Sequence, residues 1–400
     1  MPPIIFRKGL DMKAAVAGQL AAAYDSSIVD DLRNTGFART RGRLTIHLAK
    51  EFGFCYGVDR AVDYAYQTRK RFPDKRVFLT GEIIHNPHVN DQLRAQGIRF
   101  LTDPSETDAV LGHDDVVILP AFGVSVADMA RLDSQGCTLV DTTCGSVLTV
   151  WKNVKRYAQD GFTSVIHGKV THEETRATAS QATQYPDGHF LIVLNREEAG
   201  YVCDYIVHGG DRSAFLTRFG HATSRGFDPD LHLQRIGCAN QTTMLMSESL
   251  EIGEMFGAAM ARRYGPEAVP AVFRAFDTIC SATQERQDAV ISLLNDVRLD
   301  LMIVIGGYNS SNTCNLAKIC ADRCRTFHIA DPGCLVSARQ LRHRPNGQPS
   351  TSAVAEEIAL DWLPDGPITI GLTAGASTPN NIVGQVVGRL EALAAGTALT

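Results

Sequence analysis

The chain has 400 residues, of which 44% are hydrophobic and 21% are charged, as in an ordinary globular protein of two or three domains. Its formal charge is −5 at pH 7, so the overall charge indicates neither nucleic acid nor a membrane surface as a partner. No apolar stretch reaches the ~18 residues of a membrane span. An anionic ligand would therefore have to be bound by a local site.

Residues 1–43 are interpreted as an N-terminal extension with an alanine-rich helix. Their arginines are typical of a transit peptide, but Asp11, Asp25 and Asp30 argue against one, and a secretion signal is absent. We therefore expect a cytoplasmic location, where a reducing environment suits free thiols. The extension could be a dispensable arm or could pack across a neighbouring subunit, so both a monomer and a homodimer stay open.

From residue 45 onward one pattern recurs: an apolar strand, a short polar or glycine-rich loop, and a helix. The strands are expected at Thr45–Ala49, Val77–Leu79, Val116–Leu119, Ser164–Ile166, Leu301–Ile305 and Ile368–Ile370. Continuous apolar runs followed by helices predict an α/β fold with mostly parallel sheets covered on both faces. Ligands of such sheets bind at the carboxyl ends of the strands, where these polar loops lie. The glycine-rich, charged segment 209–233 is interpreted as an insertion.

Three cysteines stand in similar settings, and they are the most informative feature of the sequence. The pattern Asp-Thr-x-Cys ends at Cys144 and again at Cys280, and Cys55 likewise stands just before a helical pattern. A thiol at a helix N-terminus meets the positive end of the helix dipole, which favours the thiolate. Three such thiolates, one in each third of the chain, suggest an iron–sulfur cluster with one iron left open for substrate.

The other seven cysteines are interpreted as small buried hydrophobic residues. They are Cys137, Cys203, Cys238, Cys314, Cys320, Cys324 and Cys334. The last four could also suggest a structural zinc ion, but the chain lacks a Cys-x-x-Cys pair.

Two loops have the composition of anion sites. Segments 308–313 and 373–379 each follow a buried strand and open a helix, and both are rich in hydroxyl and amide side chains. Two such loops suit a diphosphate, although serine and asparagine are also good helix N-caps. Nucleotide binding is disfavoured, because neither a P-loop nor a G-x-G-x-x-G motif is present.

Histidine and glutamate supply the remaining chemistry. At the start of a helical pattern, His172 could bind phosphate and Glu174 could donate a proton, or the glutamate could only stabilise the first helical turn. His85 could contact an anion, or could be a solvated loop residue. Thr242, in a polar segment after an apolar stretch, offers a hydroxyl.

Taken together, these motifs resemble the 4-hydroxy-3-methylbut-2-enyl diphosphate reductase family, which acts last in the non-mevalonate isoprenoid pathway. The resemblance runs from about Thr45 to Leu390. It rests on segments 53–61, 85–87, 141–144, 172–175, 240–243, 280–287, 309–312 and 373–377. The length of the chain and the segments 119–123 and 227–230 resemble the longer form of plants and cyanobacteria.

The resemblance implies a trefoil of three α/β domains around a central [4Fe–4S] cluster. The domains would span 44–144, 145–277 and 278–390, after the extension 1–43 and before a tail at 391–400. The first strand and Cys55 could pack with the third domain instead of the first.

The resemblance also implies the roles of individual residues. Cys55, Cys144 and Cys280 would hold the cluster, and its open iron would take the allylic hydroxyl of the substrate. Glu174, with help from Thr242 and His172, would supply the proton that lets this hydroxyl leave as water. Isopentenyl and dimethylallyl diphosphate would be the products.

Substrate binding would fall to side chains from several loops. They are His85, His172, Thr242, Asn309, Ser310, Ser311, Asn312 and Ser377. An external donor would supply the electrons, and ferredoxin, flavodoxin and a nicotinamide-linked reductase all stay open.

Two positions depart from the family pattern. Phe122 stands where many members have a histidine, so we expect another cation, Lys169 or His88, to compensate. Gly145 follows Cys144 where proline is usual, which predicts a looser helix start and a more labile cluster.

Two other classes of protein compete with this interpretation. A cluster dehydratase or a quinolinate-synthase-like enzyme would act on carboxylates and would need arginine clamps, whereas the loops here favour phosphate. A cluster-based sensor bound to nucleic acid is disfavoured by the net charge and by the lack of a basic stripe.

Overall fold

The computed structural model describes residues 4–106, 109–276, 278–348 and 354–396. By compactness the chain divides into two units. Unit 1 comprises Met1–Arg7, Phe78–Gly81 and Leu101–Cys280, and unit 2 comprises Lys8–Val77, Glu82–Phe100 and Ser281–Thr400. Asp277, from the second Asp-Thr-x-Cys pattern, lies outside the described residues. The boundaries expected for three domains stay a prediction.

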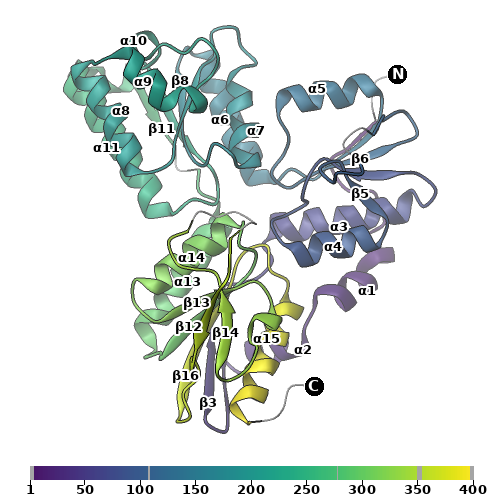
Figure 1. Cartoon of the computed structure of the whole chain (residues 1–400). Helices are drawn as coiled ribbons and strands as arrows, with labels where there is room; N and C mark the ends of the chain where they lie inside the picture. The colour runs from purple at the N-terminus through teal and green to yellow at the C-terminus, as the bar shows by residue number, and fades with distance from the viewer. Residues whose placement is uncertain (1–3, 107–108, 277, 349–353, 397–400) are drawn as a thin grey trace. The chain divides into compact units, whose positions relative to one another are not determined.

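Unit 1 holds the middle of the chain (Figure 1). Its strands are β1 (Ile5–Phe6), β4 (Val77–Leu79, entering from unit 2), β6 (Val116–Leu119), β7 (Thr138–Asp141), β8 (Thr163–His167), β9 (Phe190–Val193), β10 (Ile236–Asn240) and β11 (Phe273–Ala275). Its helices are α5 (Val126–Gln135), α6 (Gly145–Gln159), α7 (Glu173–Ala182), α8 (Arg196–His208), α9 (Arg212–Phe219), η1 (Gly220–Ala222), α10 (Pro229–His232), α11 (Met246–Tyr264), η2 (Pro266–Ala268) and α12 (Val269–Val272).

Two parallel sheets organise unit 1. In one, β7 lies between β1 and β6, and β4 follows β6. The other has the order β11-β10-β8-β9, and every neighbouring pair in it is parallel. The carboxyl ends of β8, β10 and β11 therefore lie along one edge, which positions the loops after them.

Unit 2 combines two segments from the first hundred residues with the C-terminal part of the chain. Its strands are β2 (Ala38–Arg41), β3 (Leu44–Leu48), β5 (Ile98–Phe100), β12 (Leu301–Ile305), β13 (Thr326–Ile329), β14 (Gln340–His343), β15 (Glu357–Leu360) and β16 (Ile368–Ala374). Its helices are α1 (Lys13–Tyr24), α2 (Ser27–Asn34), α3 (Tyr56–Arg71), α4 (Pro87–Ala95), α13 (Ser281–Asp296), α14 (Ser311–Ala321), η3 (Pro332–Cys334) and α15 (Asn380–Ala394).

The main sheet of unit 2 has the order β13-β12-β16-β3-β2 and is parallel except for β2, which runs antiparallel to β3. Strands β14 and β15 form a separate antiparallel pair. Because β3 lies beside β16, the segment that leads to Cys55 belongs to the same sheet as the C-terminal strands.

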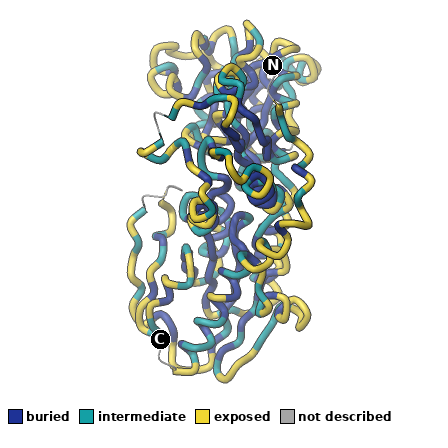
Figure 2. Tube along the Cα trace, turned by 90° about the vertical axis from the view of Figure 1, so that its right-hand side faces the viewer, coloured by how far each residue is buried: buried dark blue, intermediate teal, exposed yellow. Residues whose placement is uncertain are grey.

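The central parallel strands are buried on both faces, as their apolar runs predict, whereas the β14–β15 pair is largely exposed. In β12, Ile303 packs with residues of α2 and α15, while Met302 and Val304 face α13 and α14. In unit 1, Val165 faces α8 and α11, while Ile166 on the other face packs with α7. Figure 2 shows the buried segments of the chain in dark blue. These packed layers make rigid supports for the loops at the strand ends.

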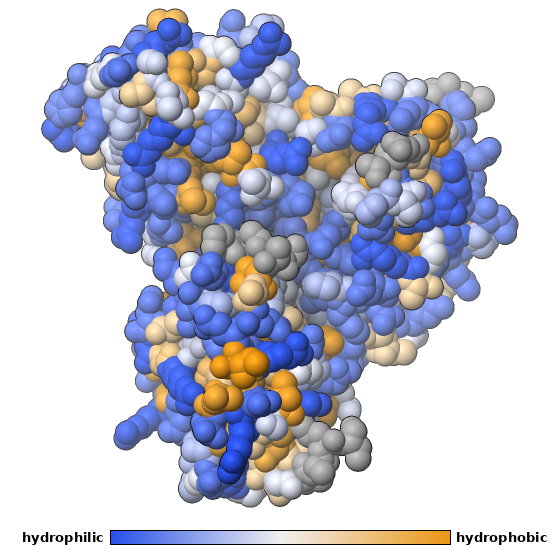
Figure 3. Space-filling model, in the orientation of Figure 1, coloured by the Kyte–Doolittle hydropathy of each residue, from blue (hydrophilic) through white to orange (hydrophobic). Residues whose placement is uncertain are grey.

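The expected α/β class with mostly parallel sheets is confirmed in the described residues. The segment 209–233, interpreted as an insertion, folds into short helices, and Phe215 and Phe219 belong to the core of unit 1. Within the described residues, no helix combines the length and the apolar character needed to cross a membrane. The face of the molecule in Figure 3 is largely hydrophilic.

Candidate functional site

The three cysteines singled out by the sequence all lie at helix N-termini. Cys55 is the N-cap residue of α3 and Cys144 that of α6, both with extended backbone. Cys280 directly precedes the first residue of α13. Neither Cys55 nor Cys144 caps its helix through its side chain in the part of the chain that the structure describes. The structure thus places all three sulfurs at the start of a helix, the shared setting that the sequence predicted for them.

The other cysteines differ from these three. Cys137, Cys238, Cys320 and Cys334 are buried as expected, whereas Cys203, Cys314 and Cys324 are only half-buried, so the expectation of burial is wrong for these three. Burial raises the pKa of the Cys203 thiol to about 12, and it also raises the pKa values of the four buried thiols. A thiol that stays protonated is a poor metal ligand, which agrees with their interpretation as packing residues.

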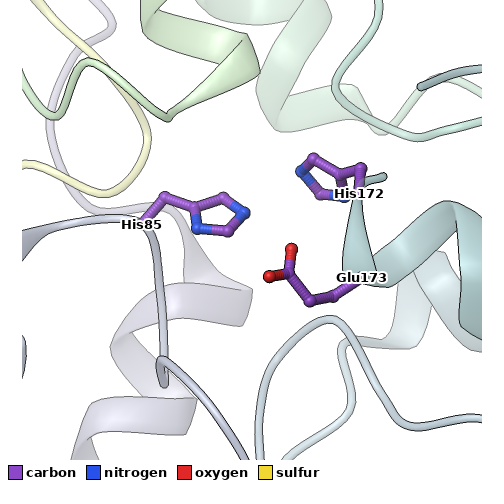
Figure 4. Close-up of side chains that lie close together, drawn as sticks. All are labelled: His85, His172 and Glu173. Carbon is purple, nitrogen blue, oxygen red and sulfur yellow. The ribbon is translucent and has the colours of Figure 1, made fainter. Parts of the chain in front are cut away.

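In unit 1, the turn after β8 carries His172 and Glu174. His172 is the N-cap of α7, and its Nδ1 accepts the Glu174 N–H at 3.2 Å. Because Nδ1 accepts this bond, the proton of the neutral imidazole lies on Nε2. Figure 4 shows His172 and its exposed neighbour Glu173 at the start of α7, together with His85 of unit 2. An Nε2–H group is a suitable donor to phosphate.

The Glu174 carboxyl group is buried, with 1% of the residue exposed. Its Oε1 accepts the backbone N–H of Thr242 at 2.6 Å. Thr242 follows β10, so the hydrogen bond connects the turns at the ends of two adjacent strands. The bond fixes the orientation of the carboxyl group and occupies one lone pair of Oε1.

The same edge of unit 1 leads on to Cys280. The Cys280 N–H bonds to the Thr242 carbonyl at 3.3 Å, and the Thr278 hydroxyl donates to Asn240 Oδ1 at 2.5 Å. Gln241, which is buried, accepts the Lys169 N–H and the Thr175 hydroxyl through Oε1. Glu174, Thr242 and Cys280 thus belong to one hydrogen-bonded network.

In unit 2, His85 lies in a polar cluster with Glu82 and Asn309. Glu82 Oε2 is 2.9 Å from His85 Nδ1 and accepts the Asn309 amide at 2.9 Å. A carboxylate hydrogen-bonded to Nδ1 fixes the orientation of the imidazole ring. His85 is buried, so this arrangement gives it a defined ring orientation rather than that of a solvated loop residue.

The two predicted anion loops meet the His85 segment. Ser377 Oγ donates to the His85 carbonyl at 3.1 Å, and Asn312 Oδ1 accepts the Ala376 N–H at 2.9 Å. Ser310 caps α14 by accepting the Thr313 N–H, so the N-cap alternative holds for it. The loops meet because they follow β12 and β16, which are adjacent strands.

Asn312 carries a buried donor, Nδ2, that has no hydrogen-bond partner among the described residues. Its neighbour Ser311 opens α14 and is also buried. An unpaired buried donor costs free energy, about 1–3 kcal/mol, unless a ligand or water satisfies it. The N-terminus of α14 is therefore the part of unit 2 with the character of an anion site.

Cys55 is tied to the same loops. Its N–H donates to the Ala376 carbonyl at 3.1 Å, and the guanidinium of buried Arg286 bonds to the Gly53 carbonyl at 2.7 Å. Gly53 has a φ of +72°, and a Cβ there would lie 3.1 Å from Asn380 Oδ1. The loop before Cys55 is thus fixed by contacts far apart in sequence.

The structure shows the surroundings of Phe122 and Gly145, the two positions that depart from the family pattern. The Phe122 ring packs edge-on against His172, with centroids 5.5 Å apart. Burial lowers the pKa of His88, which disfavours a positive charge on it and leaves Lys169 as the better candidate for compensation. Gly145 is the first residue of α6.

Three residues with clear positioning roles were missed from the sequence: Glu82, Gln241 and Arg286. Gln241 and Arg286 stand in the recognised segments 240–243 and 280–287, and Glu82 lies three residues before His85. Their roles depend on bonds to partners far along the chain, at Asn309, Lys169 and Gly53. Only their position within the motifs could have indicated them.

Comparison with known proteins gives a consistent picture. The family model described as LytB protein matches residues 46–391. A 4-hydroxy-3-methylbut-2-enyl diphosphate reductase of Gloeobacter violaceus is 50% identical over 393 residues, with 96% of this chain and 91% of that protein covered. One of a Synechococcus species is 49% identical over 387 residues, covering 96% and 94%.

Solved structures agree with the sequence relatives. One, described as (E)-4-hydroxy-3-methyl-but-2-enyl diphosphate reductase, the terminal enzyme of the non-mevalonate pathway, aligns with a TM-score of 0.52 at 26% identity and covers 86% of this chain and 98% of its own. The reductase from Plasmodium falciparum aligns with a TM-score of 0.60 at 21% identity, covering 86% of each chain, and supports the fold alone.

Proposed function

Since the chain belongs to the LytB protein family, we propose that its cysteines Cys55, Cys144 and Cys280 hold a [4Fe–4S] cluster at which 4-hydroxy-3-methylbut-2-enyl diphosphate is reduced. The chain is an enzyme, a reductase of the isoprenoid non-mevalonate pathway, as its relatives are. The observation that carries the cluster proposal is the shared setting of the three cysteines, each at the start of a helix.

The reaction removes the allylic hydroxyl of the substrate. A C–O bond breaks, a C–H bond forms, and two electrons and two protons are consumed as water leaves. The bound cluster would supply the electrons one at a time, and its open iron would act as a Lewis acid toward the hydroxyl oxygen. The products would be isopentenyl and dimethylallyl diphosphate.

Glu174 is the proton donor in this proposal. Hydroxide is a poor leaving group, so a carboxylic acid that delivers a proton as the C–O bond breaks lowers the barrier. The Thr242 N–H holds Oε1, so the proton would be carried by Oε2. The Thr242 N–H orients this carboxyl group, and His172 fixes the Glu174 backbone by accepting its N–H through Nδ1.

The diphosphate would be bound by donors from both units. In unit 2 these are His85, held by Glu82, together with the side chains at the starts of α14 and α15. They are Asn309, Ser310, Ser311, Asn312 and Ser377. The unpaired Nδ2 of Asn312 supports this role, because an anion would supply the missing acceptor. In unit 1, His172 would donate through Nε2, and the Thr242 hydroxyl would complete the set.

The electrons must come from outside the chain, and we propose an external redox protein: ferredoxin, flavodoxin or a nicotinamide-linked reductase. We also propose a cytoplasmic location, since all ten cysteines are free and a cluster with an open iron needs a reducing compartment. The boundaries 44–144, 145–277 and 278–390 remain our proposal for the domains.

Anaerobic turnover by cluster-reconstituted protein with a low-potential chemical reductant tests this function. Formation of both five-carbon diphosphates is the expected result. An intact, reduced cluster that leaves the substrate unchanged would contradict the proposal and would favour a cluster dehydratase.

A further inference from the structure

The N-terminal extension is folded onto the unit that contains Cys55. Helix α1 lies beside α3, and α2 packs against α15 (Figure 1). Gln67 of α3 fixes the approach to α1, because its Oε1 accepts the N–H groups of Leu10 and Met12 at 3.1 and 3.2 Å. Residues 8–43 of the extension are thus an integral part of unit 2, whereas Ile5 and Phe6 pair with β7 of unit 1.

Tyr24, the last residue of α1, connects the extension to the loop that carries Cys55. Its ring lies 5.6 Å from that of Phe54, the residue before Cys55. Its hydroxyl bonds to the Tyr66 hydroxyl of α3 at 3.0 Å, and only 5% of the residue is exposed. The Ala23 carbonyl accepts the Asn381 amide at 2.7 Å, which fixes the end of α1 against α15.

Phe54 and Cys55 are therefore held from two directions. On the side of the C-terminal loops, Cys55 N–H bonds to the Ala376 carbonyl. On the side of the extension, Tyr24 supplies the ring that Phe54 contacts. A cavity of about 450 Å³ lies between α1 and the start of α3, with Tyr24, Phe54 and Cys55 among its lining residues. Packing by Tyr24 thus limits how far the loop can move into this space.

We propose that the N-terminal extension supports the cluster ligand Cys55, and that Tyr24 is the positioning residue through which it does so. The inference rests on the proposed role of Cys55. A ligand must be held within about 0.5 Å of its productive place, and residues behind the ligands commonly set metal affinity. Without the Tyr24 ring, Phe54 and Cys55 gain freedom to move toward the cavity, and the ligand is released more readily.

The test compares Tyr24→Ala with Tyr24→Phe and with Val16→Ala, a buried position on the same helix that does not line the cavity. Each protein is reconstituted without oxygen, and three quantities are measured: iron per chain, the electron paramagnetic resonance spectrum of the reduced cluster, and the rate of cluster loss to an iron chelator. We expect Tyr24→Ala to lose its cluster about tenfold faster than wild type, with an altered spectrum. Tyr24→Phe, which keeps the ring, and Val16→Ala should behave as wild type.

Wild-type rates and spectra in Tyr24→Ala would overturn the inference, as would equal cluster loss in Val16→Ala, which would indicate general loosening of the helix. If Tyr24→Ala does not fold, Phe54→Leu removes the same ring contact from the other side and takes its place. Cys55→Ser separates the two proposals: if that variant binds iron as wild type does, the ligand assignment itself fails.

Discussion

At the scale of single residues, each proposed polar site residue uses one side-chain atom in a hydrogen bond within the protein. Glu174 gives one carboxyl oxygen to Thr242, and His172 gives Nδ1 to the Glu174 backbone. His85 is held in the same way, through Nδ1 and Glu82. In each case this hydrogen bond orients the side chain, and we propose that the other oxygen or nitrogen of the same group interacts with the substrate.

Replacing Glu174 by glutamine tests the proton donor. Glutamine keeps an oxygen that can accept the Thr242 N–H but has no acidic proton, so we expect turnover to fall by about 10²–10⁴ with little change in stability. The matched control is Glu173→Gln, the exposed neighbour, which should retain activity. Steady-state kinetics would contradict the assignment if Glu174→Gln stayed within a few-fold of wild type.

Replacing Glu82 by glutamine tests the positioning of His85. An amide oxygen is a weaker acceptor than a carboxylate and holds the His85 ring less firmly, so we expect KM for the diphosphate to rise roughly tenfold, about 1.4 kcal/mol, with a smaller effect on kcat. Asp91→Asn, whose carboxylate pairs instead with exposed Arg94, serves as the control. An unchanged KM in Glu82→Gln would show that the contact between Glu82 and His85 does not contribute to substrate binding.

His167 predicts a pH dependence of stability in unit 1. Burial lowers its pKa from 6.5 to about 4, so between these values the unfolded chain binds a proton that the native chain does not. The free energy of unfolding should therefore fall as the pH drops from about 6.5 to 4, by about 3 kcal/mol from this group. Hydrogen exchange of β8 amides at pH 7 and pH 5, between which this group accounts for about 2 kcal/mol, measures the effect, and His167→Gln should remove most of the difference. An equal pH effect in that variant would refute the assignment.

At the scale of elements, the recurring strand–loop–helix pattern made it possible to predict which loops follow buried strands. The loops at 308–313 and 373–379 were predicted to follow buried strands. These strands are β12 and β16, which are adjacent in the sheet. That adjacency could not be predicted, because it depends on strand order rather than on local pattern. For the same reason the sequence did not reveal Arg286, whose partner Gly53 lies 233 residues away.

The start of α6 gives a prediction about helix geometry. Cys144 has φ −62° and ψ 141°, an extended conformation that a following proline favours, and a Cβ on Gly145 would meet open space. Gly145→Pro should therefore raise the stability of unit 1 by about 0.4–1 kcal/mol and slow the loss of the cluster. Chemical denaturation and chelator kinetics check it. Gly253→Pro, in the interior of α11, is the contrasting variant and should destabilise the unit.

At the scale of the whole molecule, the candidate residues fall into two groups. Cys144, Cys280 and Glu174 belong to unit 1, while Cys55 and His85 belong to unit 2. The cysteines and Glu174 could be proposed from the sequence because their motifs are local. The inclusion of residues 8–43 in the same unit as Cys55 was not predicted, because it depends on packing contacts such as that of Tyr24 with Phe54.

The central claim is that three cysteines hold a four-iron cluster with one iron open to the substrate. Mössbauer spectroscopy of ⁵⁷Fe-reconstituted protein, recorded with and without 4-hydroxy-3-methylbut-2-enyl diphosphate, tests it most directly. We expect one iron of the four to have a distinct Mössbauer signal that changes when the substrate binds. We also expect the cluster to be lost in Cys55→Ser, Cys144→Ser and Cys280→Ser. Four irons that do not respond to substrate, or a full cluster in any of these variants, would contradict it.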